Sequence, residues 1–217
     1  MTVFALKMIA VISMVIDHIG MIFIPRDMLL YDVFRGVGRL AFPIFAFLLV
    51  EGFLHTKNIK KYILRMLFFA AISEIPFDLF TSNRIINMGH QNVIVLLALG
   101  LVMLFFVNKW KNPILHLFFV AIASGISMIL RVDYSLWGII LIYWFYCSRN
   151  MRWGKTIGVA LIYIYRGGLY LCSILAMIPI LFYKGEQGPR AKWVFGIFYP
   201  LHLAILYVIA YAIYLLP

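Results

Sequence analysis

The chain has 217 residues, of which 65% are hydrophobic and only 12% are charged. A soluble domain of this length needs many more charged side chains to cover its surface, so the composition excludes an ordinary soluble enzyme. The formal net charge of +11 comes from short basic clusters between apolar stretches. These clusters lack interleaved base-stacking residues, so no nucleic-acid partner is expected.

Apolar stretches recur along the whole chain, and a helix needs about 20 mostly apolar residues to cross about 30 Å of hydrocarbon. No small-residue cleavage site follows the first stretch, so we interpret it as a retained helix rather than a signal peptide. The expected fold is all-α, a polytopic membrane protein with about nine short transmembrane helices around a central cavity, in a single domain over residues 1–217. The expected spans are 5–24, 37–54, 62–80, 92–108, 113–130, 134–147, 155–165, 168–183 and 194–215.

The least regular part of this pattern is 113–183, where several stretches are shorter than a full span. Here Arg166-Gly167-Gly168 is either a tight turn or a break within one long helix.

Basic residues between the expected spans follow the positive-inside rule. With nine spans and a cytoplasmic N-terminus, eleven basic residues lie in cytoplasmic loops and five in outer loops. The cytoplasmic set is Lys57, Lys60, Lys61, Lys109, Lys111, Arg149, Arg152, Lys155, Lys184, Arg190 and Lys192, and the outer set is Arg26, Arg35, Arg84, Arg131 and Arg166. We therefore expect a multi-pass protein of the plasma membrane with its N-terminus in the cytoplasm and its C-terminus outside.

Half of the eight acidic residues, Asp17, Glu51, Glu74 and Asp78, lie in or at the ends of the first three apolar stretches. An ionised side chain at the bilayer centre costs roughly 2.5–3.5 kcal/mol on insertion scales. Such groups usually face a bundle interior or a wet cavity. We therefore interpret these four acidic residues first as functional, and the alternative is that they form structural ion pairs.

Lys7 and His18 are eleven residues apart, which is close to three helical turns and places them on one helix face about 16 Å apart. An anionic ligand entering from the cytoplasm would meet first a fixed positive charge and then an imidazole able to act as a general base. Asp17 lies about 100° around the helix from His18. A snorkelling lysine and a buried structural histidine are the alternative.

Further polar residues mark the next two spans. Arg39 precedes Pro43 by four residues, and near a proline kink it could pair with a carboxylate or bind an anionic group. Glu51 and His55 are also four apart and share a helix face. Glu74 and Asp78 flank Pro76, and this pair suits either proton handling or a structural network.

The remaining candidates are Asn92 and His202. Asn92 could cap the fourth helix, or with His90 and Gln91 it could line the entrance to a site. His202 follows Pro200 and is a second buried imidazole, a residue that is more often structural. Neither a Walker loop, a dinucleotide fingerprint, a zinc-protease helix nor a serine elbow occurs. The two cysteines show no metal spacing, so no metal is expected.

Five stretches have a more specific pattern: Leu6-Lys7 through Asp17-His18-Ile19-Gly20, Gly38-Arg39-Leu40-Ala41-Phe42-Pro43-Ile44-Phe45-Ala46-Phe47, Val50-Glu51-Gly52-Phe53, Ser73-Glu74-Ile75-Pro76-Phe77-Asp78 and Phe198-Tyr199-Pro200-Leu201-His202-Leu203. Together they closely resemble the TraX family, which is named for a conjugative-pilus maturation protein that acetylates the pilin N-terminus. The resemblance runs along nearly the whole chain, although residues 110–190 match mainly in hydropathy.

The resemblance implies a compact branch of the transmembrane acyltransferase superfamily, which uses acetyl-CoA. That superfamily has a basic residue, ten residues and then a histidine in its first helix, as do Lys7 and His18. The implied activity is therefore acetyl transfer from acetyl-CoA to an amine or hydroxyl acceptor, such as a peptide N-terminus or a sugar. His18 is then the catalytic base, with Asp17 or Glu51 orienting it. The resemblance also draws attention to Arg39, Glu51, Glu74 and His202. The candidate substrate-binding or cofactor-binding residues are altogether Lys7, Arg39, Glu74, Asp78, Asn92 and His202.

Two other classes of function stay open at this point. A small proton-coupled transporter would use the intramembrane acids as relays, but no internal repeat is detectable. A non-catalytic membrane assembly subunit would use its buried charges only for pairing.

Overall fold

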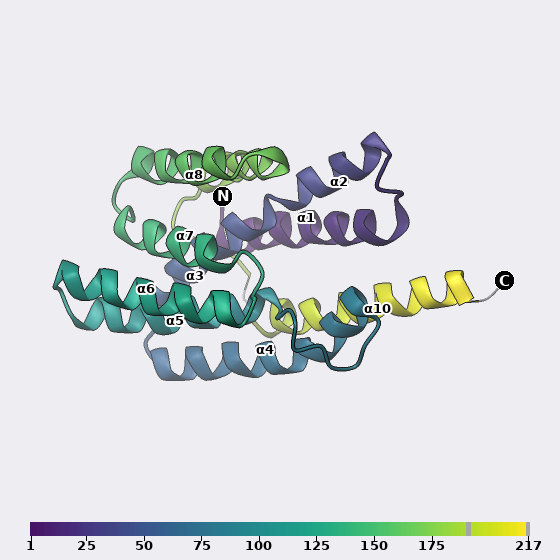
Figure 1. Ribbon diagram of the computed structural model, residues 1–217. Coiled ribbons are helices and arrows are strands. Elements are labelled where there is room, and N and C mark those ends of the chain that lie inside the picture. Colours follow the sequence, from purple (N-terminus) through teal and green to yellow (C-terminus); the bar gives the residue numbers. More distant parts are fainter. Residues whose placement is uncertain (190–191, 216–217) are drawn as a thin grey trace. The chain divides into compact units, whose positions relative to one another are not determined.

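The computed structural model describes residues 1–189 and 192–215, with side chains given outside 190–195 and 214–217 (Figure 1). Its contacts divide the chain into two compact units. Unit 1 comprises Met1–Leu48 and Met151–Pro217, and unit 2 comprises Leu49–Asn150. This division concerns contacts alone, and the single domain over residues 1–217 stays a prediction.

Unit 1 brings the two ends of the sequence together. Its N-terminal part consists of α1 (Val3–Phe23), α2 (Leu29–Gly38) and the first half of α3 (Ala41–His55). Its C-terminal part consists of α8 (Arg152–Arg166), the 3-10 helix η1 (Gly168–Ala176), α9 (Met177–Leu181) and α10 (Lys192–Leu215). The helix α1 packs along α2, and it also contacts α10, which is nearly two hundred residues away in the sequence.

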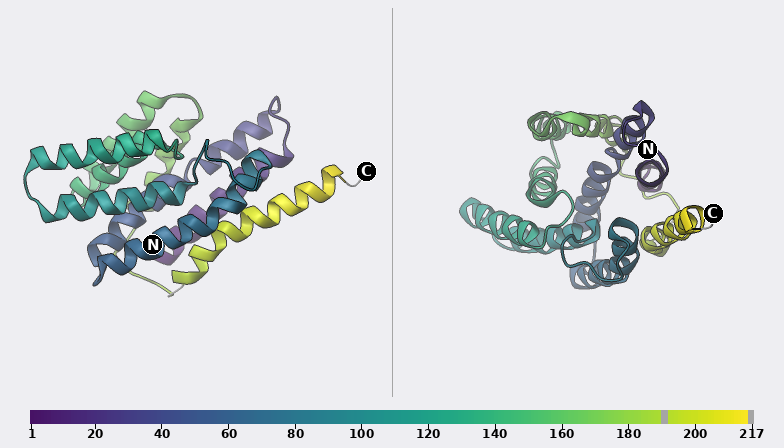
Figure 2. Two further views of the ribbon diagram at one scale, coloured as in Figure 1. Left: turned by 60° about the horizontal axis from the view of Figure 1, so that its bottom comes forward. Right: turned by 45° about the vertical axis from the view of Figure 1, so that its right-hand side comes forward.

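Unit 2 contains the rest of α3 and four further helices: α4 (Ile59–Ser82), α5 (Val93–Lys109), α6 (Pro113–Ile129) and α7 (Ser135–Cys147). The helices α5 and α6 form an antiparallel hairpin, and α7 packs against both (Figures 1 and 2). Asparagine side chains cap three of these helices by accepting from a backbone N–H in the first turn, at Asn58, Asn92 and Asn112. The predicted cap at Asn92 is confirmed.

The all-α prediction is confirmed, since the described residues form helices and no strand. Eight of the expected spans coincide with a helix to within a few residues. The helix α2 was not predicted, because Asp32 and Arg35 interrupt its apolar pattern. The chain leaves the helix between α2 and α3 because Pro43, in the first turn of α3, has no N–H for the carbonyl of Arg39.

The expected span 168–183 is the exception. It contains the 3-10 helix η1 followed by the five-residue α9 rather than one long helix. Gly167 and Gly168 have φ angles of 66° and 57°, a left-handed conformation that ends α8. Arg166-Gly167-Gly168 is therefore a tight turn, after which η1 and α9 run back along α8, so that Arg152 at the start of α8 reaches Leu181 at the end of α9.

Within the part of the chain that is described, three helical segments are long and apolar enough to cross a bilayer: Val3–Phe23, Leu29–His55, which comprises α2 and α3, and Gly196–Ile213. Shorter apolar helices are Val93–Lys109, Pro113–Ile129, Ser135–Cys147 and Gly168–Leu181. The protein is thus a membrane protein. The orientation of its termini and the central cavity stay predictions.

Candidate functional site

Two histidines from opposite ends of the sequence meet inside unit 1. His18 Nδ1, on α1, lies 2.8 Å from His202 Nε2, on α10. The two ring planes are nearly parallel, 13° apart, with their centroids 5.0 Å apart. His202 is 6% exposed, and the ring of Phe198 stacks on it with the two centroids 5.2 Å apart. The structure thus brings together two residues that the sequence only suggested one at a time.

The hydrogen bonds around this pair specify where its protons lie. His202 Nδ1 is 2.9 Å from the carbonyl oxygen of Phe198, which can only accept, so Nδ1 has the proton. In neutral His202 the Nε2 atom is then an acceptor, and His18 Nδ1 must donate to it. This assignment leaves the lone pair of neutral His18 on Nε2, the atom that a general base uses.

Asp17 is bound by two arginines on the neighbouring helix. Its Oδ2 accepts from Arg35 Nη1 at 2.8 Å, and its Oδ1 lies 3.4 Å from Arg39 Nη2. All three side chains are mostly buried, with 12–21% of their surface exposed. This pairing confirms that Arg39 contacts an intramembrane carboxylate, which was one of its two predicted roles. The orientation of His18 by Asp17 stays a prediction.

Arg35 lies in α2 and contacts Asp17, whereas the charge pattern of the sequence predicts an outer loop at this position. The signal was present, because Arg35 and Arg39 are four residues apart and so share a face of any helix that contains them. The approach of α1 to α2 depends on Gly38, where an added Cβ would lie 2.2 Å from the Cβ of Asp17. This close approach lets both arginines reach one carboxylate.

More positive charge lies near this cluster. The guanidinium of Arg39 lies 5.3 Å from the ring centroid of Tyr170 in η1, and that of Arg166 lies 3.6 Å from the same ring. Arg166 Nη1 is buried without a hydrogen-bond partner among the described residues. Three arginines and one aspartate thus give this end of unit 1 a net positive charge, which favours an anionic ligand or a developing negative charge.

Lys7 is half-buried in α1, eleven residues before His18. The helix is continuous from Val3 to Phe23, so the predicted separation of about 16 Å along its axis holds. Lys7 therefore lies toward the start of α1 and His18 toward its end.

The other predicted catalytic residue, Glu51, belongs to unit 2. It lies 4.0 Å from His55 one turn later in α3, and His55 Nδ1 is 2.8 Å from the backbone carbonyl of Glu51. These contacts confirm the predicted Glu51–His55 face. The proposed action of Glu51 on His18 stays a prediction.

Glu74, Asp78 and Asn92 form a second polar cluster, within unit 2. Asn92 Nδ2 donates to the carbonyl of Ala70 at 3.0 Å and to Glu74, while its Oδ1 caps α5. Asp78 Oδ2 accepts from the backbone N–H of Asn87 at 2.7 Å. These bonds tie the loop before α5 to α4, and they give Asp78 and Asn92 structural roles. Binding of substrate by this cluster stays a prediction.

A contact between His90 and Asp133 was not expected from the sequence. His90 Nε2 lies 2.8 Å from Asp133 Oδ1, next to an isolated bridge between Gln91 and Val132. The hydrogen bond with Asp133 is the main cause that raises the pKa of His90 above its usual value. Forty-three residues separate the two, so spacing alone could not pair them. No group of three or more potential metal ligands occurs in the part of the chain that is described.

Comparisons with known proteins agree with the resemblance described above. The pattern of the family described as "TraX protein" matches residues 3–210. The chain is 31% identical to the "Probable fimbrial assembly protein FimC, serogroup H1" of Dichelobacter nodosus over 232 residues. That alignment covers 94% of this chain and 93% of the relative. No solved structure matches the chain.

Proposed function

Because this chain belongs to the TraX family, we propose that it is a membrane-embedded acetyltransferase. It takes an acetyl group from acetyl-CoA and passes it to an amine or hydroxyl acceptor, with His18 as the general base. The observation that supports this most directly is the 2.8 Å contact between His18 Nδ1 and His202 Nε2. When an acceptor holds the Nδ1–H of a histidine, the lone pair lies on Nε2, and this is the tautomer that can take a proton from a nucleophile through Nε2.

In this proposal the acceptor nitrogen or oxygen attacks the thioester carbonyl carbon while its proton passes to His18 Nε2. The tetrahedral intermediate then collapses, the carbon–sulfur bond breaks, and the thiolate takes the proton back from His18. His202 keeps His18 in the correct tautomer and stabilises the imidazolium that forms, and is therefore a positioning residue. This assignment adds a positioning role to His202, which the sequence suggested only for binding.

The arginine cluster supports the same proposal. Arg35 and Arg39 fix Asp17, which immediately precedes His18 on α1. Their excess positive charge favours the negative charge that develops on the carbonyl oxygen during attack.

The D. nodosus relative is named as a fimbrial assembly protein. We propose on this basis that the acceptor belongs to a surface assembly and presents either an amine, such as a peptide N-terminus, or a hydroxyl. The same name favours a second candidate function, a non-catalytic assembly subunit in which the buried charges only stabilise the fold. No contact described above favours the transporter.

The proposal is tested by reconstituting the purified protein in membranes and measuring the transfer of labelled acetyl groups from acetyl-CoA. His18→Ala should lower turnover by about 10²–10⁴-fold, the usual contribution of a general base. His116→Ala is the matched control, because His116 is a half-buried histidine of unit 2 that contacts the Trp110 carbonyl and the Tyr143 hydroxyl.

The role of His202 has its own test. His202→Gln retains an acceptor for His18 Nδ1 and should keep part of the activity, whereas His202→Leu removes the acceptor and should alter the pH dependence of turnover. Equal activity in His18→Ala and wild type would exclude the catalytic assignment. If assembly proceeded normally with His18→Ala, the non-catalytic subunit would become the better description.

A further inference from the structure

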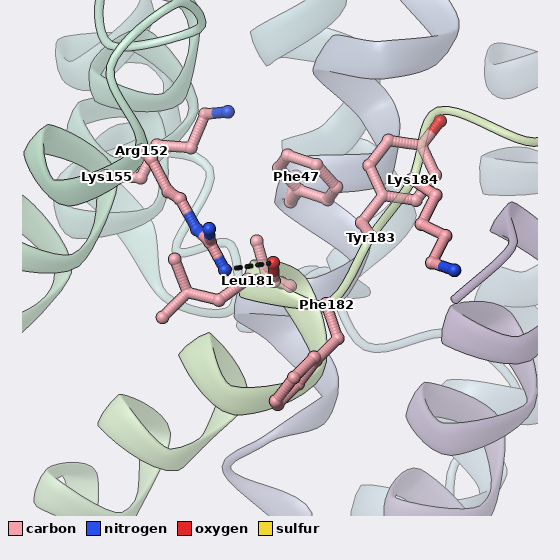
Figure 3. Close-up of a pocket in the computed structure, with 8 residues that line it drawn as sticks. Phe47, Arg152, Lys155, Leu181, Phe182, Tyr183 and Lys184 are labelled. Atoms are coloured by element: carbon pink, nitrogen blue, oxygen red, sulfur yellow. Dashed lines mark hydrogen bonds between the residues drawn. The ribbon is translucent and has the colours of Figure 1, made fainter.

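A basic pocket of about 370 Å³ lies within unit 1, at the start of α1 and away from His18 (Figure 3). Its side chains come from α3, α8, the end of α9 and the segment after α9. Three are cationic and three are aromatic: Arg152, Lys155, Lys184, Phe47, Phe182 and Tyr183. Among the described residues that line it, none is acidic.

The contacts between these residues give the pocket a defined shape. Arg152 Nη2 donates to the carbonyl of Leu181 at 3.3 Å, which ties α8 to the end of α9 (Figure 3). The ammonium of Lys155 lies 5.5 Å from the ring centroid of Phe47. The rings of Phe47 and Tyr183 are nearly perpendicular, with their centroids 5.4 Å apart. Phe47 is 2% exposed, so the floor of the pocket is rigid and aromatic.

The pocket is fixed to the start of α1 by backbone hydrogen bonds. Lys184 N donates to the Met1 carbonyl at 3.0 Å, and Val3 N donates to the Glu186 carbonyl at 2.8 Å. His18 lies fifteen residues beyond Val3 on the same continuous helix, which corresponds to about 22 Å along its axis. A ligand that reaches from this pocket to His18 must therefore be long and narrow.

The geometry points to a binding site for the phosphorylated nucleotide end of coenzyme A, an inference that rests on the proposed function. Its phosphates would bind the ammonium and guanidinium groups of Lys155, Lys184 and Arg152. Its adenine ring would stack on Phe182 and Tyr183, the two more exposed aromatic side chains, since an aromatic face accepts any base.

The length of the ligand agrees with this placement. The pantetheine arm is roughly a dozen bonds long and spans about 15 Å when extended. The diphosphate and ribose add several more ångströms, so the nucleotide can lie in the pocket while the thioester reaches His18. Lys7 lies between the two ends, on the His18 face of α1. The predicted orientation places Arg152, Lys155 and Lys184 in the cytoplasm, where coenzyme A is available.

Binding of coenzyme A itself, which has no acetyl group and cannot turn over, tests this inference. The full-length protein in an uncharged detergent is titrated with labelled coenzyme A. We expect Lys155→Gln with Lys184→Gln to weaken binding about tenfold, which corresponds to about 1.4 kcal/mol. Competition by pantetheine, which lacks the nucleotide, should be the same in this double variant and in wild type.

Two control variants separate this inference from the proposed function. Lys57→Gln with Lys109→Gln removes the same charge from another pocket, in unit 2 and also in predicted cytoplasmic loops, and should bind coenzyme A as wild type does. His18→Ala should also bind normally while losing turnover. If wild type binds no coenzyme A, both the inference and the proposed function are wrong.

Other outcomes overturn the inference alone. If Lys155→Gln with Lys184→Gln binds coenzyme A as tightly as wild type, the nucleotide lies elsewhere while the acetyltransferase proposal stands. Phosphate groups of anionic lipids share this chemistry, so retention of lipid is measured in zwitterionic vesicles with and without phosphatidylglycerol. If the double variant loses only its preference for phosphatidylglycerol, the pocket binds a lipid headgroup and not coenzyme A.

Discussion

Substitution of Gly38 by alanine tests whether α1 and α2 approach as closely as the Asp17 cluster requires. An ideal Cβ at Gly38 would lie 2.2 Å from both the Cβ and the Oδ1 of Asp17. Carbon–carbon contacts normally lie at about 3.5–4.0 Å, so the two helices must separate locally by more than about 1 Å. That movement would pull Asp17 away from Arg35 and Arg39.

The expected cost follows from two opposing effects. Overpacking a well-packed position costs about 1–3 kcal/mol, while replacing glycine by alanine in a helix regains at most about 1 kcal/mol. Gly38→Ala should therefore lower the free energy of unfolding by about 1–2 kcal/mol. Tryptophan fluorescence during titration of the detergent-solubilised protein with SDS measures this change.

Gly125→Ala is the matched control. Gly125 lies within α6, where an added Cβ would meet nothing within 4 Å. This variant should gain about 0.5–1 kcal/mol of stability, because alanine loses less conformational entropy in a helix than glycine does. If Gly38→Ala were as stable as Gly125→Ala, the close approach of Asp17 to α2 would be wrong.

Two further predictions concern unit 2. Asn92→Ala removes a helix cap and leaves buried polar groups without partners, so it should lower the free energy of unfolding by about 2–3 kcal/mol. Its control, Asn112→Ala, removes only an exposed cap and should cost about 1 kcal/mol or less. Equal losses of stability in thermal unfolding would contradict the buried network around Asn92. The raised pKa of His90 means that its pair with Asp133 stabilises the fold fully below the usual histidine pKa of about 6.5 and loses this effect as pH rises through the raised value. The difference in melting temperature between wild type and Asp133→Asn should accordingly shrink between about pH 6 and about pH 9. A difference that grew with pH would refute the assignment.

The helices themselves were largely predictable from the sequence. Apolar stretches and their polar boundaries gave α1, α4, α5, α6 and α7 to within a few residues, because hydrophobic length and capping are local properties. Asn92 was recognised as a cap for the same reason. The helix α2 could not be predicted in this way, because its charged residues are explained only by a partner on α1, Asp17, that is distant in the sequence.

The candidate site was predicted only in its separate residues. The face that joins Lys7 and His18 follows from helical periodicity, and the likeness to the TraX family drew attention to Arg39 and His202. By contrast, the pairing of His18 with His202 spans 184 residues, and no local pattern encodes a contact over that separation. The same limit applies to His90 and Asp133.

The amino-acid sequence by itself determined that the chain is helical, apolar and bound to a membrane, because the cost of exposing backbone and charge to lipid acts on each segment separately. The tertiary structure decided which polar side chains meet: His18 with His202, and Asp17 with Arg35 and Arg39. A buried polar group must find a partner wherever the fold supplies one. These partners come from distant helices, so only the packing of α1 against α2 and α10 could identify them.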